Sequence, residues 1–233
     1  MLKNPFRGLT RREWCLWGLS CGALVLCNLL SGSIDPLTLL ANLVGATFLI
    51  FLARGDVWGQ LLTIVFSLLY GAISWRSRYW GEMITYLGMT MPMAALSVVS
   101  WLRHPFAEAE GEQHNEVEIH HLTLPQAGRM ALITAAVTAF FGYILYRLDT
   151  PNLFWSTLSV TTSFLAAYLT FMRSSWYGLA FAANDLILIM LWLLDGKPPM
   201  AANFAVFFIN DCNGFISWKR REVHQLAEKH RHG

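Results

Sequence analysis

The sequence predicts an all-α polytopic membrane protein with about eight transmembrane helices. Three observations support this class: 55% of the 233 residues are hydrophobic, only 14% are charged, and the apolar residues gather in segments long enough to span a bilayer. Soluble domains carry about 25% charged residues, so an ordinary soluble enzyme is excluded. The net charge of +2 offers no bulk attraction for nucleic acid, and we expect no nucleic-acid partner.

Eight apolar segments bounded by charge, proline or glycine are candidates for membrane-spanning helices. They are residues 14–33, 37–53, 57–75, 79–102, 127–148, 153–172, 176–194 and 200–218. Segments this long and apolar cross a membrane as helices and not as barrel strands. The first has no small-residue cleavage site and leads directly into further spans, so we expect a retained helix and not a signal peptide.

The basic residues predict the orientation. With the N-terminus in the cytoplasm, 13 of the 17 Lys and Arg residues lie inside, and four lie outside: Arg76, Arg78, Arg147 and Lys197. Eight spans then place both termini in the cytoplasm. We infer a multi-pass protein of a bacterial inner membrane, with the lipid bilayer as its first partner.

Cysteine and histidine give no sign of a metal site. Cys15, Cys21 and Cys27 lie in the first apolar segment, and neither they nor Cys212 form a CxxC pair. The polar stretch 103–126 has four histidines without zinc-ligand spacing, so we expect a solvated loop there and neither metal nor cofactor. These histidines are His104, His114, His120 and His121. We expect the basic tail, with His224, His230 and His232, at the charged lipid surface.

An internal repeat organises the chain. Segments 37–102 and 156–218 each contain three helices in the same layout. Shared landmarks are Arg54 and Arg173 after the first helix, and Trp101 and Trp218 at the end of the third. The single helix between the triplets gives both the same orientation. We therefore predict two parallel three-helix repeats joined by a linker helix (3+1+3), plus one extra N-terminal helix.

This layout divides the chain into five parts. They are 1–36, a cytoplasmic N-terminus and extra transmembrane helix; 37–102, the first three-helix bundle; 103–152, a cytoplasmic loop and linker helix; 153–218, the second three-helix bundle; and 219–233, a basic cytoplasmic tail.

Two pairs of polar residues lie at membrane depth, where ionisable side chains indicate function. Asn184-Asp185 is at the middle of one span, and Asn210-Asp211 is at the middle of the next. The helices run in opposite directions, so we expect Asp185 and Asp211 to face one shared cavity. The alternative is that these residues only hold helices together, through hydrogen bonds of roughly 0.6 kcal/mol each. Glu82 lies near the outer end of its span and is expected to face water.

Helical spacing adds further side chains to these faces. One stripe on 200–218 holds Asn203, Phe207, Asn210 and Asp211, and Trp192 shares a face with Asp185. In the first triplet, Tyr86 and Thr90 begin the corresponding stripe, and Tyr70 lies next to a face with Ser67 and Ser74. The first triplet thus offers hydroxyls where the second offers carboxylates, which predicts an asymmetric site. The run of Ser and Thr over 156–163 is expected to serve close helix packing.

Such a cavity suits a flat, polar and cationic ligand. Stacking on aromatic side chains contributes roughly 1–3 kcal/mol per base. A desolvated cation over a ring contributes about 2 kcal/mol. Nicotinamide riboside combines a pyridinium, a ribose and a carboxamide, and thiamine also has a cationic ring. The residues alone do not separate these ligands.

Parts of the second triplet resemble the bacterial nicotinamide riboside (mononucleotide) transporter family, the Pnu-type vitamin transporters. The matching motifs are SVTTSFLAAYLTFMR (159–173), AANDLILIMLW (182–192), NFAVFFIND (203–211) and GFISW (214–218). The resemblance extends over roughly 37–218. It implies a SWEET-like fold of two three-helix bundles with a linker helix.

The resemblance also implies a function. Members of this family take up vitamin precursors by facilitated diffusion, and a cytosolic nicotinamide riboside kinase traps the substrate. We therefore expect a transporter for nicotinamide riboside, not an enzyme, assembled as a homo-oligomer, a trimer by resemblance. The implied substrate-binding residues are Asn184, Asp185, Trp192, Asn203, Phe207, Asn210 and Asp211, together with Tyr70, Tyr86 and Thr90 in the first triplet, where the match is looser.

The same residues leave one alternative open and argue against two others. Relatives that handle thiamine, riboflavin or nucleosides keep another vitamin, nucleoside or small sugar open as substrate. An intramembrane aspartyl protease would use Asp185 and Asp211 as two carboxylates sharing a proton, but the Gly-x-Gly-Asp signature is missing. A retinal protein is excluded because no lysine lies inside a span. No broken helix suggests ion coupling, although either Asp could carry a proton.

Overall fold

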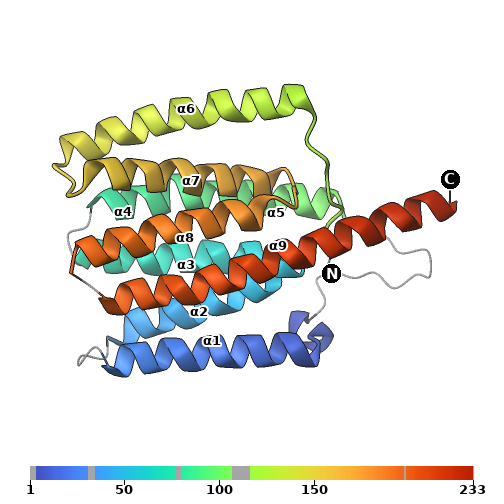
Figure 1. The fold of residues 1–233 in the computed structure, drawn as a ribbon, viewed down its shortest axis with the longest axis horizontal. Coiled ribbons are helices and arrows are strands. Elements are labelled where there is room, and N and C mark those ends of the chain that lie inside the picture. Colours follow the sequence, from blue (N-terminus) through green and yellow to red (C-terminus); the bar gives the residue numbers. More distant parts are fainter. Residues whose placement is uncertain (1–3, 31–34, 77–79, 107–115, 197, 233) are drawn as a thin grey trace.

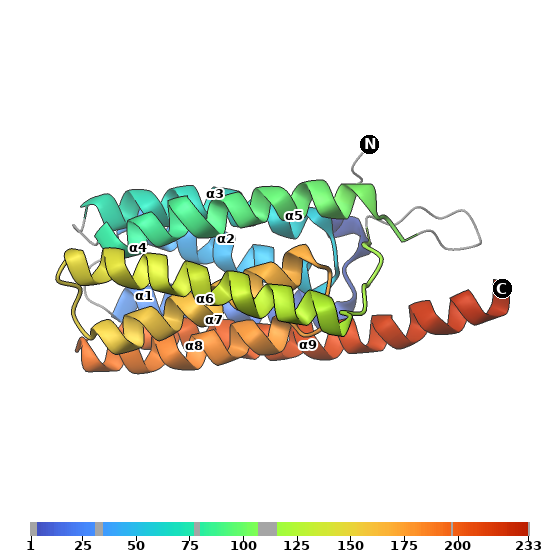
Figure 2. The same ribbon diagram turned by 90° about the horizontal axis from the view of Figure 1, so that it is seen from above.

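The computed structural model describes residues 4–30, 35–76, 80–106, 116–196 and 198–232. Figures 1 and 2 show their helices lying side by side in one elongated bundle. The predicted class, an all-α polytopic membrane protein, is confirmed. Lys3, Arg78, His114 and Lys197, which entered the charge and metal arguments, lie outside the described residues.

The helices follow the predicted spans to within a few residues over most of the chain. They are η1 (Pro5–Gly8), α1 (Arg11–Leu30), α2 (Pro36–Ala53), α3 (Val57–Arg76), α4 (Trp80–Thr85), α5 (Met91–Arg103), α6 (Leu124–Arg147), α7 (Leu153–Phe171), α8 (Tyr177–Leu194) and α9 (Pro198–His232). A π-helical turn, η2 (Tyr86–Thr90), joins α4 to α5, so the described residues form eight long helices. The main departure is α9, which continues 14 residues beyond the predicted end of its span.

Five helical stretches are long and apolar enough, by length and composition, to cross a membrane. They are Pro36–Ala53, Val57–Arg76, Trp80–Arg103, Leu124–Arg147 and Tyr177–Leu194. The other long helices are more polar. Helix α1 begins with three charged residues, α7 contains the hydroxyl run, and α9 holds amides, a carboxylate and a basic tail. All three pack against the apolar helices in the same bundle.

Local sequence explains where elements begin and where one of them distorts. Asp35 caps α2: its carboxylate accepts hydrogen bonds from the backbone N–H of Thr38 at 3.3 Å and from the Thr38 hydroxyl at 2.7 Å. This hydroxyl bond is the main cause that lowers the pKa of Asp35 below its usual value. Pro92 has no N–H for an interior helical bond, and the chain before it widens into the π turn, with Met91 bonded back to Tyr86.

Six helices form a closed ring in the order α2, α3, α5, α7, α8, α9, with α9 packing back against α2. The first bundle supplies α2, α3 and α4–α5, and the second supplies α7, α8 and α9. Helix α6 packs on the outside of α7, and α1 packs on the outside of α2 and α9. The predicted 3+1+3 arrangement with an extra N-terminal helix is therefore confirmed.

The repeat extends to single hydrogen bonds at an offset of 118 residues. In the turn after α2, the Gly55 N–H donates a hydrogen bond to Leu52 O, and the Asp56 N–H donates one to Phe51 O. In the turn after α7, the Arg173 N–H donates to Thr170 O, and the Ser174 N–H donates to Leu169 O. Gly55 and Arg173 both adopt positive φ, at 69° and 58°. The structural counterpart of Arg173 is thus Gly55, and the predicted pairing of Arg173 with Arg54 is wrong by one residue.

The connection between α5 and α6 packs against the bundle where it is described. We call residues 116–122 the strap. Val117 and Ile119 in the strap are only 3% and 8% exposed, and they pack with Trp101 and Trp218. The expectation of a solvated loop is therefore wrong for the strap. In an extended segment alternate residues point the same way, so Val117 and Ile119 reach the core while Glu118 points elsewhere.

Candidate functional site

Two cavities lie within the bundle, and the outer one is also bounded by the end of α6 and the turn that follows it. The outer cavity, of about 190 Å³, reaches the end of the bundle where α4 begins and α8 ends, and its lining includes Trp80, Glu82 and Asp195. The inner cavity, of about 80 Å³, lies deeper, between all six ring helices. Five residues line both cavities: Tyr86, Ser163, Asn184, Leu188 and Phe204. The two cavities are therefore neighbouring chambers of one path.

Aromatic rings occupy the junction of the two chambers. The Tyr70 and Tyr86 ring centroids are 4.3 Å apart, and Phe66 packs on Tyr70 at 5.6 Å. Phe207 of the second bundle approaches Phe66 at 6.5 Å. Gly45 on α2 leaves room for this contact, since a Cβ there would lie 2.8 Å from the Phe207 ring. These rings provide a stacking surface for a planar ligand.

Asn184 is oriented by hydroxyl groups of α7. Its amide oxygen accepts a hydrogen bond from Thr162 Oγ1 at 2.8 Å and a weaker one from Ser159 Oγ at 3.5 Å. Because the oxygen is engaged on the helix side, the amide nitrogen is the group left to serve both chambers, which Asn184 lines. Asn184 therefore presents a hydrogen-bond donor to any ligand.

The two carboxyl groups predicted to share a cavity are brought together. Asp185 on α8 and Asp211 on α9 both line the inner cavity, are 4% exposed each, and lie within hydrogen-bonding reach of each other. Asp185 Oδ2 is buried without a hydrogen-bond partner among the described residues. A buried carboxyl oxygen needs a polar or positive partner, which a cationic ligand in the chamber would supply.

Comparison with known proteins agrees with this geometry. The family model of the nicotinamide mononucleotide transporters matches residues 35–220. The chain belongs to the nicotinamide mononucleotide transporter family. It is 22% identical to the nicotinamide riboside transporter PnuC of Neisseria mucosa, over 77% of this chain and 70% of the relative. It is 19% identical to the nicotinamide riboside transporter PnuC of Haemophilus influenzae, over 79% of each chain.

A solved structure shares the fold of this family member. The crystal structure of the vitamin B3 transporter PnuC superposes with a TM-score of 0.77 at 19% sequence identity, covering 94% of both chains. The family match, together with this fold, makes the chain a membrane transport protein and not an enzyme.

Within this transporter, eight of the ten predicted site residues line the chambers. Tyr70 and Trp192 line the outer one, Thr90, Asp185, Phe207 and Asp211 the inner one, and Tyr86 and Asn184 both. Asn203 and Asn210 line neither. Asn210 Nδ2 donates to Ser20 Oγ of α1 at 2.9 Å and to Val206 O at 2.8 Å, and Asn203 lies one heptad earlier on the same face. Asn210 therefore faces the outer helix α1, whereas Asn203 contacts Met200 of its own helix, 4.0 Å from Nδ2 to Sδ.

Several lining residues were missed in the sequence. Gln60 on α3 is 3% exposed and lines the inner chamber. It is a lone amide in an apolar span, and the rule that singled out Asn184 applies to it equally. Ser156, Ser159 and Ser163 line the outer chamber, so one face of the hydroxyl run faces the path. The other face does pack: Thr161 accepts a hydrogen bond from Thr138 of α6 at 3.0 Å. Glu82 lines the outer chamber as well.

Proposed function

We propose that this transporter takes up nicotinamide riboside by facilitated diffusion and that a cytosolic kinase phosphorylates the substrate and traps it. One observation carries the proposal. The described lining combines stacked aromatic rings, an amide donor and four acidic residues, Glu82, Asp185, Asp195 and Asp211, but no Lys, Arg or His. A pyridinium cation with a carboxamide and a ribose matches each of these groups.

The same charge balance favours the riboside over the mononucleotide. A phosphate monoester adds a charge of about −1.5 to −2 and takes basic partners. In the described parts of the path the charged side chains are acidic, so a phosphate would meet repulsion and find no ion pair. The names of the two curated relatives, both nicotinamide riboside transporters, support this choice.

The orientation belongs to the same proposal. Ten described basic residues lie at one end of the bundle, and two lie at the other, Arg76 and Arg147. The ten are Arg7, Arg11, Arg12, Arg54, Arg103, Arg129, Arg173, Lys219, Arg220 and Arg221. The positive-inside rule assigns the richer end to the cytoplasm of a bacterial inner membrane, with both termini there. The outer chamber then opens to the periplasmic side.

The assembly and the division of the chain are part of the proposal too. We assign binding to the bundles 37–102 and 153–218, membrane packing to the extra helix within 1–36 and to the linker helix within 103–152, and a cytoplasmic role to the loop that precedes the linker helix and to 219–233. A homotrimer is the expected oligomer, and the mass of the detergent-solubilised protein by light scattering checks it.

Uptake in cells that lack their own transporter tests the function. Labelled nicotinamide riboside should accumulate above an empty-vector control, and unlabelled riboside should compete while the mononucleotide should not. Absence of uptake would contradict the proposal. Competition by thiamine or a neutral nucleoside in place of the riboside would keep the transporter and change its substrate.

Purified protein in liposomes separates diffusion from trapping. Without kinase, the internal riboside concentration should level off at the external one and should not respond to a protonophore. Accumulation above the external concentration would instead indicate ion coupling through Asp185 or Asp211.

A further inference from the structure

The inner chamber ends on two backbone carbonyl groups that tie the bundles together. Leu52 at the end of α2 and Thr170 at the end of α7 both line its deep end. Trp218 Nε1 of α9 donates to Leu52 O at 2.8 Å. Trp101 Nε1 of α5 donates to Thr170 O at 3.0 Å. Each bond joins the third helix of one bundle to the first helix of the other.

The two indole rings fill the space beneath the chamber. Trp101 and Trp218 are 1% and 0% exposed, and their ring centroids are 5.6 Å apart. The ring centroid of Tyr177 lies 4.7 Å from that of Trp218. A buried indole N–H needs an acceptor, so moving the bundles apart would require both bonds to break or be replaced.

This arrangement is symmetric under the repeat. Leu52 and Thr170 are 118 residues apart, and Trp101 and Trp218 are 117 apart. The two indole–carbonyl bonds are therefore equivalent positions of the internal repeat. When parallel repeats rock against each other, equivalent contacts change together, so this pair of bonds forms or breaks as one unit.

The strap is hydrogen-bonded, on the cytoplasmic side, to the turn after α2 and to the turn after α7. Val117 N–H donates to Gly55 O at 3.1 Å, and His120 N–H donates to Arg173 O at 3.0 Å. These acceptors are the two positive-φ residues that correspond in the repeat. The strap is thus bonded to one turn of each bundle.

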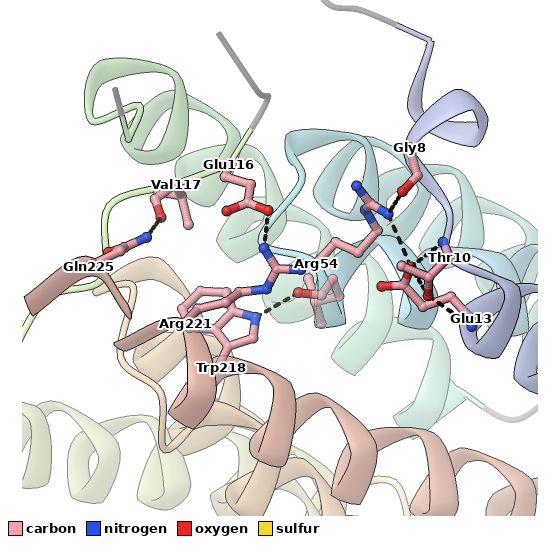
Figure 3. A network of polar contacts seen from close by, with 10 residues as sticks. Gly8, Thr10, Glu13, Arg54, Glu116, Val117, Trp218, Arg221 and Gln225 are labelled. Carbon is pink, nitrogen blue, oxygen red and sulfur yellow. Dashed lines mark hydrogen bonds and ion pairs between the residues drawn. The ribbon is translucent and has the colours of Figure 1, made fainter. Parts of the chain in front are cut away.

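The extension of α9 secures the strap. Gln225 Nε2 donates to Val117 O at 3.1 Å, and Gln225 Oε1 accepts from Ile119 N–H at 2.9 Å. Arg221 pairs with Glu116. Figure 3 shows Gln225, Arg221 and Trp218 following one another along α9 toward Val117, Glu116 and the α2 end. The additional turns of α9 bring these side chains within reach of the strap.

We propose that Trp101 and Trp218, backed by the strap, form the cytoplasmic gate of the transport path and that this structure holds the gate closed. The larger chamber at the opposite end then corresponds to the outward-facing state. The proposal rests on the proposed direction of transport and on the family's transport activity, but not on the identity of the substrate.

Thiol accessibility tests the gate. Ser97 lines the inner chamber and is 1% exposed, and Ser97→Cys is nearly isosteric there. The four native cysteines are replaced by alanine, and right-side-out and inside-out membrane vesicles are treated with a small membrane-impermeant thiol reagent. With the gate intact, labelling should be faster from the periplasmic side. Faster or equal labelling from the cytoplasmic side of this parent would overturn the proposal.

Conservative variants then open the gate. Trp101→Phe or Trp218→Phe keeps a ring and removes the donor. Each should raise cytoplasmic labelling of the Ser97→Cys protein roughly fivefold, the shift expected for one lost hydrogen bond. The double variant should raise it further. Trp176→Phe is the matched control because Trp176 lies at the same end, is 50% exposed and packs on Phe215 of its own bundle.

Two results separate a gate from a structural role. If either single variant elutes as folded protein and labels like the Trp176→Phe control, the gate proposal is wrong. If both single variants fail to fold, Gln225→Ala releases the strap without touching an indole, and an unchanged cytoplasmic labelling rate in that variant would equally overturn it. Riboside transport is measured in parallel, so failure of the proposed substrate is seen independently of gate opening.

Discussion

The two bundles have the same backbone arrangement, but they present different side chains to the transport path. Their turns repeat bond by bond at an offset of 118 residues, and the tryptophan bonds repeat at their ends. At that offset, Asp185 of the second bundle corresponds to Ser67 of the first. The Ser67 hydroxyl bonds the carbonyl of Thr63 on its own helix at 2.8 Å, whereas Asp185 faces Asp211.

This difference separates two tasks. Rocking of one bundle against the other depends on backbone contacts that exist in two equivalent copies. Recognition of an asymmetric ligand with one cationic ring and one sugar depends on side chains that are not repeated. Both bundles contribute rings, hydroxyls and an amide, but the buried carboxyl pair Asp185 and Asp211 comes from the second bundle alone. Variants at corresponding positions should therefore have unequal effects on binding.

The largest effect is expected at Asp185. Asp185→Asn replaces the carboxyl group beside Asp211 with an amide that cannot pair with a cationic ring, and the dissociation constant for nicotinamide riboside should rise roughly 10- to 100-fold, as for loss of a charge-assisted hydrogen bond. Calorimetry on purified protein measures it. Ser67→Ala is the matched variant in the first bundle and should leave affinity nearly unchanged. Equal losses of affinity in both variants would contradict the unequal contribution of the two bundles to binding.

The next effect concerns Thr162. Thr162→Val keeps the shape but removes the donor that orients Asn184, and the KM for riboside uptake should rise roughly fivefold, with Thr162→Ser restoring it. Thr161→Val removes a hydroxyl one residue away that bonds Thr138 of α6, so it should leave KM unchanged. A change in maximal rate alone would assign Thr162 a structural role.

An effect of similar size is expected at the ring layer. Tyr86→Leu should weaken riboside binding by about 1 kcal/mol, the lower range for stacking of a base on an aromatic side chain. Tyr86→Phe keeps the ring and should bind nearly as tightly as the parent. The lipid-facing Tyr143, 59% exposed, provides the control variant Tyr143→Leu. Identical affinities for Tyr86→Leu and Tyr143→Leu would remove Tyr86 from the site.

The smallest effect lies at the cytoplasmic end, where Glu222 contacts three partners. It accepts hydrogen bonds from Ser175 at 2.9 Å and Lys219 at 2.8 Å, and its other oxygen lies 3.0 Å from His121. Burial acts to raise its pKa, but the Lys219 and Ser175 bonds, with the charges of Lys219 and His121, outweigh burial and lower the pKa below its usual value.

A depressed carboxyl pKa stabilises the folded protein at pH values above the unfolded pKa. The contribution of Glu222 is therefore fully present above about pH 5 and is lost as the pH falls through its lowered pKa. Glu222→Gln should lower the melting temperature slightly at pH 7, and the difference should shrink in acid. Thermal unfolding of both proteins at several pH values checks this. A difference that grows in acid would contradict the assignment.

Much of the chamber lining could be predicted because polarity is rare within apolar spans. Asp185 and Asp211 stood out as carboxylates at the middle of neighbouring antiparallel helices, and helical geometry placed them at one depth. Asn210 stood out for the same reason but turns toward Ser20 of α1. Its sequence neighbourhood is equivalent, and only the position of α1 outside the ring decides that this amide packs and does not line the path.

By itself the sequence determined the helical membrane class, the approximate limits of the long helices, and the parallel repeat, because helix length, apolar composition and charge distribution are local properties of the chain. Tertiary structure alone decided which faces meet. The reciprocal bonds of Trp101 and Trp218 and the bond from Gln225 to the strap join residues that are 69, 166 and 108 positions apart. Contacts over such separations depend on how rigid helices dock, and no local pattern encodes that arrangement.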